Sequence, residues 1–119
     1  MLFKGIRPMP PKTKVSKEEI LSTAVNLVRN DGENALNARN IARSLGCSTQ
    51  PIFSNFINMD ELRAAVKEKA NILYQNCLAA DMSAGKYPPY KASGMAYIRF
   101  AREEKELFKL LFMCDRSRE

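Results

Sequence analysis

The sequence predicts an all-α protein, and two observations support this fold class. Apolar residues recur at three- and four-residue spacing along several segments, which places them on one face of a helix. Residues that start and stop helices bound these segments, among them a capping-box pair at Ser16 and Glu19 and a turn glycine at Gly46. The 119 residues, of which 45% are hydrophobic, suffice for about one domain with a buried core.

Residues 1–15 predict a disordered tail, because this segment is basic and rich in proline. Such an arm could follow a DNA backbone or enter a minor groove, whereas a solvated terminus or a vector remnant is the simpler interpretation. The first helix is expected to begin at Ser16 and to end at Gly32. Its apolar stripe indicates core scaffold and comprises Ile20, Ala24, Leu27 and Val28.

Two short helices joined by a tight turn are predicted between Asn37 and Phe56. Asn37 is expected to cap the first helix, and Gly46 is expected to end it in the left-handed conformation. Ser48 is expected to cap the second helix, with Pro51 in its first turn, where a missing N–H costs little. The expected inner faces comprise Ile41, Ala42, Leu45, Ile52 and Phe56, preceded by Leu36 as a buried staple residue.

The outer face of the second helix carries short, uncharged polar side chains, namely Thr49, Gln50, Ser54 and Asn55. From Asn37 to Asn58 the charged residues are arginines, with no acid among them. A helix, a glycine turn and a small polar-faced helix are typical of a DNA-reading helix-turn-helix. An ordinary solvent-facing helix is the alternative interpretation of the same residues.

The segment from Ile20 to Leu62 resembles the DNA-binding domain of the tetracycline-repressor (TetR) family of bacterial regulators. The resemblance covers about a third of the chain. It implies a helix-turn-helix DNA-binding domain over residues 16–62, then a connecting helix and a partial helical regulatory and dimerisation domain over residues 63–119. The matching residues are Ile20-Leu21, Ala24, Leu27, Gly32, Ile41-Ala42, Leu45-Gly46-Cys47-Ser48, Ile52-Phe53, Phe56 and Asp60-Glu61-Leu62.

In a helix-turn-helix the second helix enters the major groove and the first crosses the DNA backbone. Two amides, Gln50 and Asn55, can pair with adenine edges through a donor and an acceptor, and the neighbouring hydroxyls can touch a base or a phosphate. Arg39 and Arg43 would neutralise phosphates. The predicted DNA-binding residues are Asn37, Arg39, Arg43, Ser48, Thr49, Gln50, Phe53, Ser54 and Asn55.

Two residues depart from the family pattern. Phe53 stands where members usually carry a tyrosine whose hydroxyl bonds a phosphate, so it can keep the packing but not the hydrogen bond. Met59 stands where they usually carry a phosphate-binding lysine. Losing both contacts is expected to lower non-specific affinity and to flatten its dependence on salt, because fewer counterions are released.

The rest of the chain predicts three further helices. A long one is expected from Met59 to about Ala80, and the resemblance makes it the connection to the regulatory domain, although a plain bundle helix has the same pattern. A loop is expected at Asp81–Tyr90, a helix with Met95, Ile98 and Phe100 at Lys91–Arg102, and a last helix at Leu107–Met113. Such apolar stripes are more often core than ligand pocket, and no residue identifies a ligand.

The chain ends soon after its most apolar segment, LFKLLF, with nothing downstream to pack against it. Members of the TetR family continue through further helices that build the ligand pocket and the dimer interface. We therefore expect a truncated product or an incomplete gene model, whose exposed apolar surface would promote association.

Composition argues against several other classes of protein. The chain has no histidine, and Cys47, Cys77 and Cys114 are widely spaced, so we expect no zinc site, disulfide framework, catalytic nucleophile or cofactor, and no enzyme activity. No apolar run approaches the roughly 20 residues of a membrane span. The N-terminus lacks the apolar segment of a signal peptide, which together with the unpaired cysteines favours the cytoplasm.

The net charge of +6 is unevenly placed, with +5 in residues 1–17, −3 in residues 18–62 and +4 in residues 63–119. We expect a sequence-specific transcriptional regulator of double-stranded DNA, by resemblance a repressor that binds a palindromic operator as a homodimer and responds to a small-molecule effector. The alternative is a helical protein–protein interaction module, which the acidic balance of residues 18–62 favours. Operator, regulated genes and effector cannot be read from the sequence.

Overall fold

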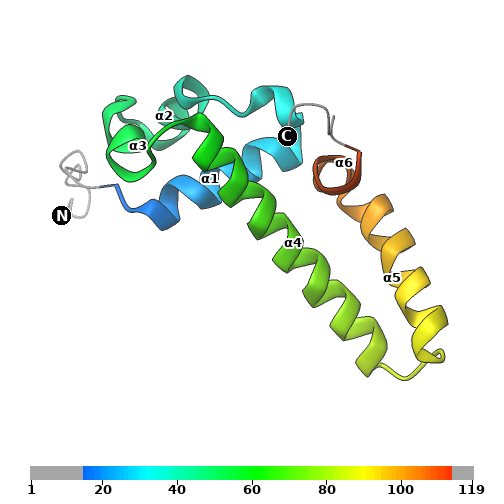
Figure 1. The fold of residues 1–119 in the computed structure, drawn as a ribbon. Coiled ribbons are helices and arrows are strands. Elements are labelled where there is room, and N and C mark those ends of the chain that lie inside the picture. Colours follow the sequence, from blue (N-terminus) through cyan, green and yellow to red (C-terminus); the bar gives the residue numbers. More distant parts are fainter. Residues whose placement is uncertain (1–14, 114–119) are drawn as a thin grey trace, which may run out of the picture.

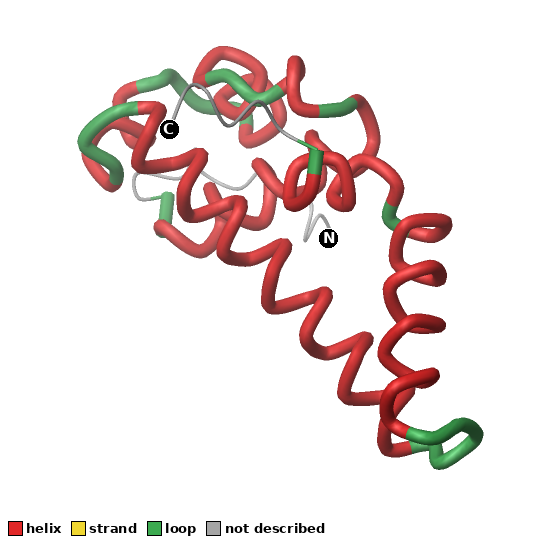
Figure 2. Tube along the Cα trace, turned by 45° about the vertical axis from the view of Figure 1, so that its right-hand side comes forward, coloured by secondary structure: helices red, strands yellow, loops and turns green. Residues whose placement is uncertain are grey.

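The computed structural model describes residues 15–113, and its regular structure in that range is entirely helical (Figure 2). The predicted all-α class is therefore confirmed. Of the predicted tail, only Val15 falls within the described residues, and it is buried. In chain order the elements are α1 Lys17–Asp31, the 3-10 turn η2 Glu33–Ala35, α2 Ala38–Leu45, α3 Gln50–Asn55, α4 Met59–Ser83, α5 Pro89–Glu103 and α6 Lys105–Phe112.

Helices α1, α2 and α3 gather around the start of α4 at one end of the molecule (Figure 1). The capping box predicted at Ser16 and Glu19 starts α1, and Gly32 ends it with a φ of 91°. Helix α1 contacts α2, α3 and α4, so these three helices pack against its apolar face. The fully buried side chains here are Ile20, Ala24, Val28, Ile41, Ile52 and Leu62.

Helix α4 leads away from this unit, and α5 runs back alongside it (Figure 1). The side of α5 that packs on α4 carries Ala92, Ala96 and Phe100, at a spacing of four residues. The predicted apolar stripe was wrong for the two other residues, because Met95 is 38% and Ile98 55% exposed. Alanines occupy the inner face of α5, because their small side chains let the two helix backbones approach.

The predicted loop at Asp81–Tyr90 was too long at both ends. Helix α4 continues through Ser83, and α5 already begins at Pro89, where a missing N–H is tolerated. Arg99 of α5 donates two hydrogen bonds to the Asp81 carboxylate, from Nη2 at 2.6 Å and from Nε at 3.3 Å. This ion pair joins the last turn of α4 to α5.

Helix α6 folds back onto α1 and α4. The segment LFKLLF packs on helices that precede it in the chain, since Leu107 and Leu110 are buried in the same core as α1. Just before α6, the guanidinium of Arg29 on α1 donates to both oxygens of Glu104, at 2.9 and 2.8 Å. These hydrogen bonds raise the pKa of Arg29, and they join α1 to the α5–α6 corner.

Gly32 also links the two parts of the chain. It is buried, it has a positive φ, and a Cβ there would lie 3.3 Å from Oε1 of Glu106 on α6. A larger residue would therefore strain the backbone and press on α6. This glycine both ends α1 and admits α6 beside it.

Aromatic rings close the space between α4, α5 and α6. Tyr74 meets the rings of Tyr97, Phe100 and Phe112 edge to face, with centroids 5.3 to 6.5 Å apart. Burial raises the pKa of Tyr74. Such pairs add about 0.5–1.5 kcal/mol each to stability, beyond the contribution of the area that they bury. The cluster therefore stabilises the packing of α6 against α4 and α5.

We predict that apolar packing, not the ion pair, holds α6 on α1. Leu107→Ala should lower the free energy of unfolding by about 2–5 kcal/mol, because a buried leucine leaves a cavity. Glu104→Gln should cost at most about 1 kcal/mol, because a partly exposed pair is screened by water and salt. Urea unfolding at low and high salt measures both, with Glu68→Gln on the exposed face of α4 as the control. Equal losses for the leucine and glutamate variants would contradict this ranking.

Candidate nucleic-acid interface

The turn between α2 and α3 has the geometry that the sequence predicts. Oδ1 of Asn37 accepts a hydrogen bond from the Asn40 N–H at 2.8 Å and so caps α2. Gly46 is left-handed, with φ 70° and ψ 36°, and the following Cys47 N–H donates to Ala42 O at 3.0 Å. This pattern satisfies the last carbonyls of α2 while the chain reverses.

Helix α3 is short, and the prediction that Ser48 caps it was wrong, because its N-cap residue is Thr49, whose side chain makes no capping hydrogen bond. Oγ of Ser48 accepts a hydrogen bond from the Gln50 N–H at 3.3 Å, although the regular helix begins one residue later than predicted, after Thr49. Phe56 is buried as expected, but it lies past the end of α3 in extended backbone. The six-residue helix is therefore anchored to the core by two buried side chains, Ile52 within it and Phe56 just after it.

The outer face of α3 is exposed. Gln50, Phe53 and Ser54 lie three and four residues apart, so they share this face, and Thr49 precedes them. Ser54 Oγ donates to Gln50 O at 3.0 Å, which leaves its lone pairs open to a ligand. Within residues 15–113 the Gln50 side-chain amide has no hydrogen-bond partner. This amide is thus available, with both its donor and its acceptor, to an outside group.

Asn55 differs from the prediction. It is half-buried, and its Nδ2 donates to Pro51 O at 2.8 Å and to Val15 O at 3.3 Å. Pairing with an adenine edge requires a free donor beside the acceptor, and both amide hydrogens are engaged here. Asn55 instead fastens the chain before α1 to α3. The available signal was its position three residues after the buried Ile52.

The positive charge of this region lies on α2. Arg39 and Arg43, four residues apart, are both exposed and share one face. Nη1 of Arg43 donates to Asn40 Oδ1 at 3.1 Å, and Asn40 Nδ2 donates to Ala35 O at 2.9 Å. Asn40, which the sequence analysis did not single out, therefore joins η2 to α2 and helps to position Arg43.

Phe53 is not a core residue. Its side chain is 48% exposed on the outer face of α3, and Ile57, four residues later, is 81% exposed. The sequence analysis missed Ile57, which lies just after α3. Met59, by contrast, packs partly buried against the core. The Ile57 N–H donates to Glu61 Oε1 at 2.7 Å, which holds the turn into α4.

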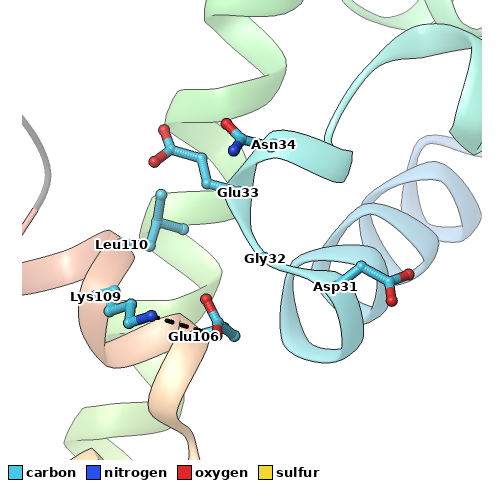
Figure 3. A pocket seen from close by; sticks show the side chains of 7 residues that line it. All are labelled: Asp31, Gly32, Glu33, Asn34, Glu106, Lys109 and Leu110. Atoms are coloured by element: carbon cyan, nitrogen blue, oxygen red, sulfur yellow. Dashed lines mark ion pairs between the residues drawn. The ribbon is translucent and has the colours of Figure 1, made fainter.

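A hollow of about 270 Å³ lies away from α3, between the end of α1, η2 and α6 (Figure 3). Three of its side chains are carboxylates, and its one lysine, Lys109, pairs with Glu106 at 3.5 Å. The negative charge of these carboxylates is unfavourable for binding a phosphate. The residues that line the hollow do not indicate which effector would bind there. The lining residues are Asp31, Gly32, Glu33, Asn34, Glu106, Lys109 and Leu110.

The described residues form neither a metal-binding site nor a site for thiol chemistry. No group of three or more histidine, cysteine, aspartate or glutamate side chains is placed there to hold a metal ion. Cys47 and Cys77 are free thiols, and burial raises the pKa of Cys77. Cys114 lies outside the described residues. No described helix is both long enough and apolar enough to cross a membrane.

We predict that the two amides of α3 have separate roles. Asn55→Ala should lower the free energy of unfolding by about 1–2 kcal/mol, because two hydrogen bonds are lost. Gln50→Ala should change it by less than about 0.5 kcal/mol, because its side chain is exposed. Chemical denaturation followed by circular dichroism measures both, with Asn76→Ala on the exposed face of α4 as the matched control. An Asn55 variant as stable as this control would contradict the fastening role.

Comparison with protein-family models gives no match, and comparison with curated proteins gives none either. The resemblance of Ile20 to Leu62 to the TetR family therefore stays a prediction from the residues that carry it.

Proposed function

We propose that this chain binds double-stranded DNA through α2 and α3 and regulates transcription as a member of the TetR family. The observation that carries the proposal is the exposed Gln50 amide, which has no hydrogen-bond partner within residues 15–113 and lies on a six-residue helix anchored by the buried Ile52. A solvent-facing helix needs no such support, whereas base readout requires side chains held in register.

The dimensions of α3 suit a major groove. The groove is about 12 Å wide and an α-helix with its side chains is about 10–12 Å across, so short outer side chains are favoured. Thr49, Gln50 and Ser54 meet this requirement. Gln50 would pair with an adenine edge, accepting from N6 and donating to N7. The two hydroxyls would bond a base edge or a phosphate.

Helix α2 supplies the phosphate contacts in this proposal. Arg39 and Arg43 are exposed on one face, and no acid lies between Asn37 and Asn58. Asn37 keeps an amide N–H₂ for a phosphate while its oxygen caps α2, and the Ser48 hydroxyl can donate to another. Two arginines give a salt slope of only about −1.8 per half-site, in line with the expected effect of Phe53 and Met59.

Regulation and dimerisation belong to the same proposal. Met95 and Ile98 are exposed on α5, and they support self-association as a homodimer on a palindromic operator. Contacts of α6 with α1 offer a route by which a small-molecule effector could act on the DNA-binding unit. The effector stays unidentified.

A protein-docking module is the second candidate, because Phe53 on α3 and Ile57 just after it both expose apolar surface. Salt separates the two functions. Contacts to phosphates weaken as salt rises, whereas apolar docking does not.

We predict distinct effects of α2 and α3 variants on DNA affinity, measured by anisotropy after selection from random duplexes. Arg39→Gln/Arg43→Gln should weaken binding to all duplexes alike and reduce the salt slope by about 1.8 for each half-site. Gln50→Ala should reduce the preference for the selected duplex by about 5- to 150-fold, because one bidentate base contact is lost.

The matched control is Lys91→Gln/Arg102→Gln, which removes the same charge from exposed positions on α5. Its affinity and salt slope should equal those of wild type. DNA readout would be refuted if duplex affinity changed neither with salt nor in the Gln50→Ala variant. It would also be refuted if the protein bound no duplex at all.

A further inference from the structure

The outer face of α3 carries one apolar side chain among polar ones. Phe53 lies three residues after Gln50 and one before Ser54, so it shares the exposed face of the helix with both residues. Phe53 is 48% exposed. Within residues 15–113 it has no aromatic or cationic partner. Its exposed half is therefore open to a ligand that covers α3.

The chemistry of a phenyl ring limits what it can contact on DNA. It has no hydrogen-bonding group, so it reads neither a phosphate nor a polar base edge. The C5-methyl group of thymine is the apolar group that a major groove presents, and phenylalanine is among the side chains suited to contact it. Burial of this methyl group against the ring removes apolar surface from water on both sides.

The spacing along α3 fixes where that methyl group would lie. Residues three apart on a helix have Cβ atoms about 5–6 Å apart, and successive bases of one strand rise by about 3.4 Å. We propose that Phe53 reads the C5-methyl group of a thymine within one or two base-pair steps of the adenine contacted by Gln50. This inference rests on the proposed function and adds a base preference to it.

The size of the effect follows from one buried methyl group. Burial of such a group corresponds to about a fourfold change in affinity. The replacement of thymine by deoxyuridine removes the methyl group and keeps every hydrogen-bonding atom of the base. It therefore isolates the proposed contact without any change in the protein.

The test uses a duplex selected by the full chain from a random pool, with each thymine replaced in turn by deoxyuridine. Wild-type protein should bind about fourfold more weakly at one or two positions in each half-site, beside the adenine that Gln50 requires. Phe53→Ala should bind thymine and deoxyuridine duplexes equally at those positions. Ile72→Ala, which removes a similarly exposed apolar side chain from α4, should keep the wild-type difference.

The outcomes separate the inference from the function beneath it. Wild-type binding that is equal for thymine and deoxyuridine at every position overturns methyl reading and leaves DNA binding intact. A difference that persists in a folded Phe53→Ala assigns the methyl group to another residue and also overturns the inference. No binding to any duplex overturns the proposed function, and the inference falls with it. The wild-type comparison stands even where Phe53→Ala fails to fold.

Discussion

The apolar face of α1 is the constraint on which the rest of the structure depends. Ile20, Ala24 and Val28 are fully buried, and α1 contacts α2, α3, α4 and α6. Helices as short as α2 and α3 are not stable alone in water, because nucleation is costly and few hydrogen bonds follow. Their conformation therefore comes from tertiary packing on α1 together with the caps at their ends.

Polar residues near α3 divide into those that hold the structure and those that face outward. The side chains of Asn37 and Asn55 form hydrogen bonds with backbone groups, and Asn40 connects η2 to the Arg43 side chain. Gln50 has no such task. This division explains why similar amides, five residues apart, are expected to differ in their effects on stability and on DNA affinity.

The α4–α5 hairpin and α6 return the chain to α1. The ion pair of Arg29 with Glu104 and the close approach of Glu106 to Gly32 both lie at this junction. Since α1 also supports α3, a shift of α6 would act on the proposed DNA-reading face through one packed helix. Such coupling requires two arrangements of α6 with similar free energy.

The sequence by itself determined the all-α class, the caps at Ser16 and Asn37, and the turn at Gly46, because these depend on neighbours a few residues away. Only the tertiary structure decided that Ala92 and Ala96 face inward while Ile98 faces out, and that Leu107 returns to α1. It also engaged the Asn55 donors and exposed Phe53. Each of these depends on contacts between segments far apart in the chain, which hydrophobic spacing along one helix does not specify.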